Sequence, residues 1–114
     1  MKETKEQRQN YHQNCKLIVH QKYGGKCVYC GENDLAVLTI DHINDDGNTE
    51  KHRNSSRKFY YELRTKPLRE DLQILCFNCN WRKRIYGPDM SQWDRKKVDT
   101  TKESRAVRNY SRNI

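Results

Sequence analysis

The first pattern along the chain is an apolar face that recurs at helical intervals over residues 5–22. The face consists of Tyr11, Cys15, Ile18 and Val19, with Lys22 at its end. Thr4 followed by Gln7 has the spacing of a capping box, which satisfies backbone N–H groups at a helix start. Gly24 and Gly25 follow, and glycine readily adopts the left-handed conformations that end a helix. The pattern therefore predicts a helix from about residue 5 to residue 22.

Two short apolar runs further along the chain predict strands. Residues 35–40 are short, branched and bounded by polar turns, and residues 72–75 could pair with them. From Asn80 to Tyr86 the sequence is typical of a short helix, which Gly87 and the proline after it would end. The predicted order is therefore strand, long excursion, strand and helix.

The excursion between the strands, residues 43–71, contains one helical stretch. A turn at residues 45–48 opens the excursion, and the helix is expected over about residues 56–66. Ser55 or a neighbouring Asn54 or Ser56 can cap its start, while Pro67 restricts the residue before it and closes the helix.

The charge of the chain lies in its two arms. The formal net charge is +8, of which residues 1–26 contribute +4, residues 27–93 contribute nothing and residues 94–114 contribute +4. Basic arms around a neutral middle favour a partner with a long run of phosphates, and a merely solubilising surface is the alternative. Only 33% of the residues are hydrophobic, so burial of apolar surface needs help from another stabilising device.

No apolar run approaches the ~20 residues that a membrane span needs, because the longest covers residues 35–40. The first eight residues have no hydrophobic region behind their charges, so a secretory signal is not expected. We therefore expect a chain of the reducing cytoplasm without a membrane partner. In that setting cysteines serve as metal ligands more readily than as disulfides.

Four of the five cysteines form two C-x2-C knuckles. They are Cys27, Cys30, Cys76 and Cys79. Four thiolates are the ligands of a closed structural zinc site, which stabilises the fold and leaves no open position for chemistry. Buried free cysteines or a redox C-x-x-C pair are the alternatives. The fifth, Cys15, lies on the apolar face of the first predicted helix, where we expect a small core residue.

A second group of residues indicates phosphodiester chemistry. Asp41 and His42 stand side by side at the end of the first predicted strand, and their side chains converge only if the chain leaves the pleat there. The loop that follows permits this. Asp41 and Asn80 could then hold a hard divalent cation with waters and a phosphate oxygen, while His42 takes a proton from water.

Three segments carry a resemblance to a known family. They are Cys27-x2-Cys30, Leu38-x-Ile40-Asp41-His42-Ile43-Asn44, and Leu72-Gln73-Ile74-Leu75-Cys76-x2-Cys79-Asn80. Over about residues 23–84 the chain resembles the HNH, or ββα-metal, endonucleases, most closely the bacteriophage branch similar to recombination endonuclease VII. The resemblance implies that His42 is the general base, that Asp41 and Asn80 bind Mg²⁺ or Mn²⁺, and that cleavage leaves a 5′-phosphate and a 3′-hydroxyl.

The chain also departs from the family pattern. Asn80 stands where many HNH enzymes have histidine, although the endonuclease VII branch shares the asparagine. Asp71 takes the place of the middle asparagine of the HNH name, and Asn44 the place of an additional histidine. His52 could supply that lost function, or it is an exposed loop histidine. We expect double-stranded DNA as the substrate, with branched DNA as the open alternative.

Together these patterns predict a small α+β fold with a zinc-stapled ββα-metal core over residues 23–88 and a helical insertion at about 45–70. A basic helix (1–22) precedes this core and a basic tail (89–114) follows it. Phosphate contacts are expected from Arg57, Tyr61, Arg64, Arg82, Lys83, Arg84, Arg105, Arg108 and Arg112.

Two other functions would use part of the same pattern. A zinc-stapled DNA-binding module without catalysis needs only the cysteines and the arms. A docking component of a phage DNA-processing machine would use the nuclease fold to bind a protein. Besides DNA as the partner, a homodimer or a phage protein partner therefore remains an open alternative. No helix with an evident set of base-reading side chains is present in the sequence.

Overall fold

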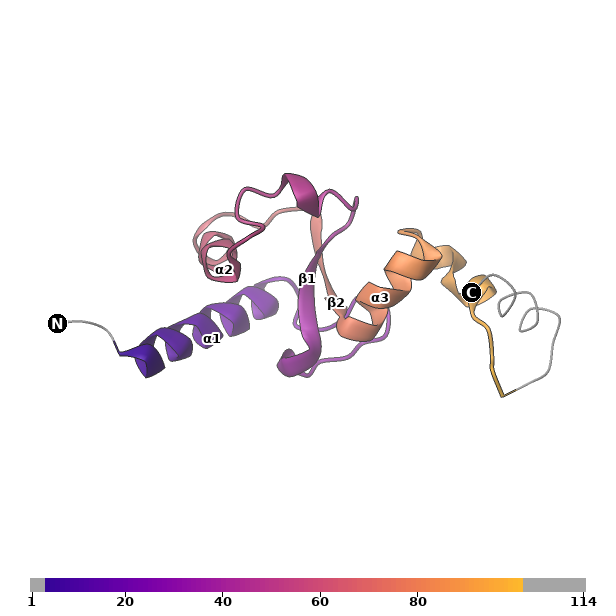
Figure 1. Ribbon diagram of the computed structural model, residues 1–114, viewed down its shortest axis with the longest axis horizontal. Helices are drawn as coiled ribbons and strands as arrows, with labels where there is room; N and C mark the ends of the chain where they lie inside the picture. The colour runs from indigo at the N-terminus through magenta and orange to yellow at the C-terminus, as the bar shows by residue number, and fades with distance from the viewer. Residues whose placement is uncertain (1–3, 102–114) are drawn as a thin grey trace.

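The protein is described by a computed structural model over residues 4–101, which confirms a small α+β fold. Within this range four α-helices and two strands follow in the order α1 (Lys5–Lys22), β1 (Leu38–His42), α2 (Ser56–Thr65), β2 (Leu72–Cys76), α3 (Phe77–Tyr86) and α4 (Trp93–Lys96). Helices α1 and α2 lie on one side of the two-stranded ribbon, and α3 lies on the other (Figure 1).

Helix α1 has the boundaries and the caps that the sequence predicts. Thr4 and Gln7 form the full capping box, with the Gln7 backbone N–H donating to Thr4 Oγ1 at 3.1 Å and the Thr4 N–H to Gln7 Oε1 at 2.8 Å. After Lys22 the chain turns through Gly24 and Gly25, whose φ angles are +110° and +75°. None of the helices within residues 4–101 has the length and apolar content that crossing a membrane requires.

The two strands pair antiparallel, with Leu38 opposite Cys76 and His42 opposite Leu72. The first strand was expected at residues 35–40 but lies further along, over Leu38–His42. Residues 35–37 form a 3₁₀ turn instead, because the Asp34 carboxylate accepts a hydrogen bond from the Ala36 backbone N–H at 3.0 Å. The strand therefore includes both Asp41 and His42.

Helix α3 begins earlier than the sequence indicates, inside the second cysteine knuckle. Cys76 ends β2 and also caps α3, because its sulfur accepts the Cys79 backbone N–H at 3.4 Å. The helix then runs to Tyr86, and Gly87 follows with a φ of +97°. Helix α2 is capped as expected, by Ser55 Oγ accepting from the Lys58 N–H.

The buried apolar residues form two hydrophobic clusters. One packs α1 on α2 and consists of Cys15, Val19, Tyr60, Leu63 and Leu72. The other gathers the cysteines around the sheet and consists of Cys27, Leu38, Ile74, Leu75, Cys76, Cys79 and Trp93. Tyr23 and Ile40 pack against both clusters and so connect them.

The core extends past the boundary at residue 88 that the sequence predicts. Trp93, at the start of α4, is fully buried, and its indole N–H donates to the Gly87 carbonyl at 2.8 Å. Tyr29 and Tyr86 pack against its ring at 4.6 and 6.2 Å between centroids. The first part of the expected tail thus belongs to the domain, because one tryptophan buries a large apolar area.

His20 gives the fold a dependence on pH. The side chain is 1% exposed, with Nε2 at 3.1 Å from the Tyr60 hydroxyl and Nδ1 buried without a hydrogen-bond partner. Burial, aided by the nearby Lys16, lowers the pKa of His20 to about 4. In the unfolded chain the imidazole of residue 20 has an ordinary histidine pKa. As the pH falls, the unfolded chain therefore takes up a proton at this residue at a higher pH than the folded protein does, and the fold loses stability.

Acidification from pH 7 to pH 5 should destabilise the wild type by about 2 kcal/mol more than His20→Gln, which has no group to protonate. The contribution of the neutral, buried His20 to the free energy of unfolding is complete above about pH 6.5 and is lost as the pH falls toward 4. Urea unfolding at both pH values measures the difference, with bound metal assayed in each sample. Equal pH dependence of the two proteins would contradict this role of His20.

Candidate metal centre and active site

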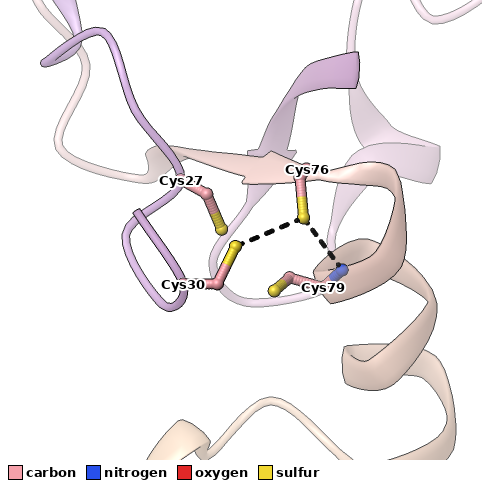
Figure 2. A group of neighbouring side chains, drawn as sticks. All are labelled: Cys27, Cys30, Cys76 and Cys79. Carbon is pink, nitrogen blue, oxygen red and sulfur yellow. Dashed lines mark hydrogen bonds between the residues drawn. The ribbon is translucent and has the colours of Figure 1, made fainter. Parts of the chain in front are cut away.

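The four knuckle cysteines form one cluster that could hold a metal ion. Their sulfur atoms all lie within 4.8 Å of one another, and Cys30 Sγ is 3.6 Å from Cys76 Sγ. A tetrahedral site with metal–sulfur bonds of about 2.3 Å needs sulfur separations of about 3.8 Å. Figure 2 shows the four side chains pointing toward one another from the first knuckle, the end of β2 and the first turn of α3.

Backbone hydrogen bonds hold the first knuckle against the sheet. The Val28 N–H donates to the Ile74 carbonyl of β2 at 3.0 Å, and the Gly31 N–H closes the turn onto the Cys27 carbonyl at 3.0 Å. Gly31 has a φ of +82°, a conformation that glycine adopts without steric cost. The cluster therefore joins a loop, a strand end and a helix start that are far apart in sequence.

Without a metal ion the surroundings of the cluster favour a thiolate at Cys27 but oppose one at Cys79, because burial raises the pKa of Cys79. Burial opposes ionisation of Cys27, but hydrogen bonds from the backbone of Cys30 and Cys76 outweigh it and lower the pKa of Cys27 to about 7. The Arg82 guanidinium donates to Cys79 Sγ at 3.3 Å. Arg82, expected to contact phosphate, therefore has a partner in the cluster.

Asp41 faces α3 and is 9% exposed. Its Oδ2 accepts from Gln73 Nε2 at 2.8 Å and from Lys83 Nζ at 2.7 Å. Gln73 is the residue directly opposite Asp41 in the sheet. Thr39, two residues before Asp41 on the same face of β1, accepts a hydrogen bond at Oγ1 from Asn80 Nδ2 of α3 at 3.0 Å. The structure therefore places Asp41 and Asn80 on the same side of β1.

Lys83 is an internal cation at this side of the strand. It is 3% exposed and its ammonium contacts three oxygens, those of Asp41, the His42 carbonyl (2.5 Å) and Asp45 (2.9 Å). Burial opposes its charge, but the two carboxylates outweigh this and raise the pKa of Lys83. Asp45 reaches the ammonium from a turn with a φ of +57°. This position corrects the expectation that Lys83 contacts phosphate.

His42 faces the opposite side, toward α2. Its Nε2 lies 2.8 Å from Glu50 Oε1, and its ring stacks on Phe59 with centroids 5.9 Å apart and planes at 25°. A Cβ at Gly47 would lie 3.2 Å from His42 Nδ1. Glycine at position 47 therefore leaves the second ring nitrogen uncovered.

A chain of charges behind His42 fixes the position of Glu50. The Glu50 side chain is 9% exposed, and Arg69 Nη1 donates to the same Oε1 at 2.7 Å. Arg69 also makes two hydrogen bonds to Asp71, at 3.0 and 2.8 Å. Burial alone would raise the pKa of Glu50, but the hydrogen bonds from His42 and Arg69 lower it, so Glu50 stays ionised.

Asp41 and His42 therefore do not converge, contrary to the expectation that the chain leaves the pleat between them. Strand β1 continues through His42, which pairs with Leu72, so the two side chains point to opposite faces. They still share one feature, because within residues 4–101 β1 pairs only with β2 and its other edge has no partner strand. The two faces meet along that edge.

The other predicted phosphate contacts have different surroundings. Arg57, Tyr61, Arg64 and Arg84 are exposed. Arg64 donates to the Tyr11 hydroxyl at 3.1 Å, and the Arg84 guanidinium lies 5.6 Å from the centre of the Trp81 ring. Arg105, Arg108 and Arg112 lie outside the described residues.

His52 has a partner in the excursion. Its Nε2 lies 2.6 Å from a carboxylate oxygen of Glu62 on α2, and its side chain is 21% exposed. It is therefore more enclosed than an exposed loop histidine, and it lines the same cavity as His42.

Four residues of the site have roles that are not evident from the sequence. Gly47 begins a short 3₁₀ turn and Glu50 follows it, whereas Lys83 and Gln73 lie in regular elements whose inward faces only the fold defines. The pairing of the strands was the one available signal, since it puts Gln73 opposite Asp41.

Neither a family model, nor a curated protein, nor a solved structure matches the chain.

If the cluster holds a metal ion, loss of that ion should unfold the domain, because three of the four cysteines lie in the hydrophobic core beside Trp93. Cys76→Ser is expected to abolish the binding of one divalent ion per chain. The variant should also lose its cooperative unfolding transition, since such sites contribute on the order of 10 kcal/mol to the folding free energy of small domains. Metal analysis and thermal unfolding followed by circular dichroism measure both effects.

Cys15→Ser is the matched control, since Cys15 is equally buried but lies outside the cluster. It should keep the full metal content and a cooperative transition. A metal-free wild type that unfolds as cooperatively as the loaded protein would contradict a structural role of the ion.

Proposed function

We propose that the chain is a metal-dependent DNA endonuclease or nickase of the HNH type, built on a zinc-stapled ββα-metal core. One observation carries the proposal: a buried carboxylate with a neighbouring amide and an oriented histidine flank the same open strand edge. The order β1, β2, α3, with the cysteine cluster at the junction of β2 and α3, supports it.

We assign zinc to the four-cysteine cluster, because four thiolates in tetrahedral reach of one another suit Zn²⁺ better than harder divalent ions. All four positions would be filled by protein sulfur. The ion would therefore stabilise the fold and take no part in hydrolysis.

A second, harder metal fits the Asp41 side of β1. The hydrogen bonds of Asp41 and Asn80 use Oδ2 and Nδ2, which leaves Oδ1 of each as an oxygen ligand. A cavity of about 380 Å³ is lined by Asn80, Lys83, Asp45, Arg84 and Gly87, and Lys83 connects it to Asp41 at 2.7 Å. Few protein oxygens and much room for water suit Mg²⁺ or Mn²⁺. Such an ion would offset the negative charge of the scissile phosphate.

His42 is the proposed general base. If Nε2–H donates to Glu50, Nδ1 is left as the acceptor for a proton from water. Glu50 would then stabilise the imidazolium that forms, while Phe59 and Arg69 keep the pair in place. Gln73 and Lys83 do the same for Asp41, since both hold its Oδ2.

One observation favours the second candidate, a zinc-stapled DNA-binding module without catalysis. The Lys83 ammonium already gives Asp41 a positive partner, and a neighbouring cation lowers the affinity of a carboxylate for a metal. In such a module Lys83 would replace the divalent ion, and DNA would be bound through exposed basic residues such as Arg57, Arg64 and Arg84.

Nicking of supercoiled plasmid tests the choice between the two. With Mg²⁺ or Mn²⁺ the wild type should relax the plasmid, and His42→Ala should be slower by about 10² to 10⁴, the usual effect of losing a general base. Gly47→Ala should also slow cleavage, because its Cβ would lie 3.2 Å from Nδ1. Rates are compared after the zinc content of each variant has been measured.

Cys15→Ser, which touches neither metal nor His42, should cleave like the wild type. Zinc-loaded wild type that binds the plasmid but leaves it intact with every divalent ion would establish the binding module instead. Cleavage by His42→Ala at the wild-type rate would remove His42 from the mechanism.

A further inference from the structure

A cavity of about 430 Å³ opens beside His42, between α1, α2 and β1. Its walls bring together side chains that are distant in sequence: His12 and Lys16 from α1, Phe59 and Tyr60 from α2, and His42 from β1. Binding pockets for small organic groups typically have volumes of about 300 to 1,000 Å³. The cavity is thus large enough for one such group next to the proposed general base.

Aromatic rings form a continuous wall of this cavity. The His12 ring contacts Tyr60, Tyr60 contacts Phe59 and Phe59 stacks on His42, each at 5.9 Å between centroids. The wall therefore leads from α1 to the proposed catalytic histidine. Phe77 at the start of α3, which is 59% exposed, lines the same cavity.

Basic side chains accompany the rings. Lys16 and Arg53 line the cavity, whereas Glu50, the one acidic residue that residues 4–101 contribute to its lining, is already paired with Arg69 and His42. Glu62, close by, is paired with His52. A ligand with a flat unsaturated ring and a negative charge matches both features, and a nucleotide has both.

We propose that this cavity binds one unpaired nucleotide, stacked on the aromatic wall next to the scissile phosphate. This inference rests on the proposed function, which places the scissile phosphate at the β1 edge beside His42. The inference narrows the substrate to DNA with an unpaired base. A base within a duplex is stacked on both faces and cannot enter the cavity without leaving the helix.

The cavity also reaches the other side of the proposed site. Thr39 lines it, and Thr39 Oγ1 accepts the hydrogen bond from Asn80. A nucleotide in the cavity would therefore place its phosphate along the edge between His42 and Asn80. The unpaired base would position the bond to be cut, without any reading of its sequence.

Fluorescence of 2-aminopurine tests this proposal by binding alone, in buffer without Mg²⁺ or Mn²⁺ so that cleavage does not interfere. The probe is placed once as an unpaired bulge and once opposite thymine in the same duplex. We expect quenching and about tenfold tighter binding for the bulge with wild type, and loss of this preference in Phe59→Leu, which keeps an apolar side chain but no ring.

Trp81→Leu is the matched control, since it removes an exposed ring on α3 that does not line the cavity. It should keep the bulge preference. If circular dichroism and zinc content show that Phe59→Leu is misfolded, Phe77→Leu replaces it, with the same loss of preference expected.

Equal binding of bulged and paired duplex by wild type would overturn the proposal, as would an unchanged bulge preference in folded Phe59→Leu and Phe77→Leu. A wild type that prefers the bulge and never cleaves DNA contradicts the proposed nuclease and supports the cavity as a nucleotide site. The two failures are therefore distinguishable.

Discussion

The convergence of four cysteine sulfurs is the constraint on which the rest of the structure depends. Cys76 ends β2, caps α3 and belongs to the cluster, so one residue sets the direction in which the helix leaves the sheet. Asn80 follows directly after Cys79, and its side chain is therefore placed against Thr39 of β1. With only 33% hydrophobic residues, the chain has little apolar surface that could define this junction otherwise.

The charges at the two faces of β1 are balanced by partners from other parts of the chain, on one face from the helix that begins at the cluster. On one face Lys83 of α3 balances Asp41, and on the other Arg69 balances Glu50 behind His42. Buried charges are tolerated only with such partners, because an unpaired ion loses its hydration without compensation. The same contacts that make burial acceptable also hold the side chains in fixed orientations, which is what hydrolysis at the strand edge would require.

Local signals account for what could be predicted from the sequence. The capping box at Thr4, the glycines after α1 and the two C-x2-C spacings act over a few residues, so they indicate helices and a cysteine site without knowledge of the fold. The separate roles of the three basic residues 82–84 follow only from the folded structure. Successive residues of a helix point in different directions, and these three reach a sulfur of the cluster, the Asp41 carboxylate and the Trp81 ring. The partner of His42 was equally hidden, since Glu50 belongs to a loop without a repeating pattern.

The most direct test of the central claim is whether Asp41 and Asn80 hold a divalent ion at the open edge of β1. Mn²⁺ is titrated into zinc-loaded, ¹⁵N-labelled protein, and broadening of the Asn80 side-chain amide is compared with that of the Gln7 side-chain amide. Gln7 belongs to the first turn of α1, at the end of the helix that lies away from the sheet (Figure 1). The account predicts that the Asn80 signal broadens at low Mn²⁺ while the Gln7 signal persists, and that Mg²⁺ competes. Broadening of the Asn80 amide no stronger than that of the Gln7 amide at equimolar Mn²⁺ would contradict it.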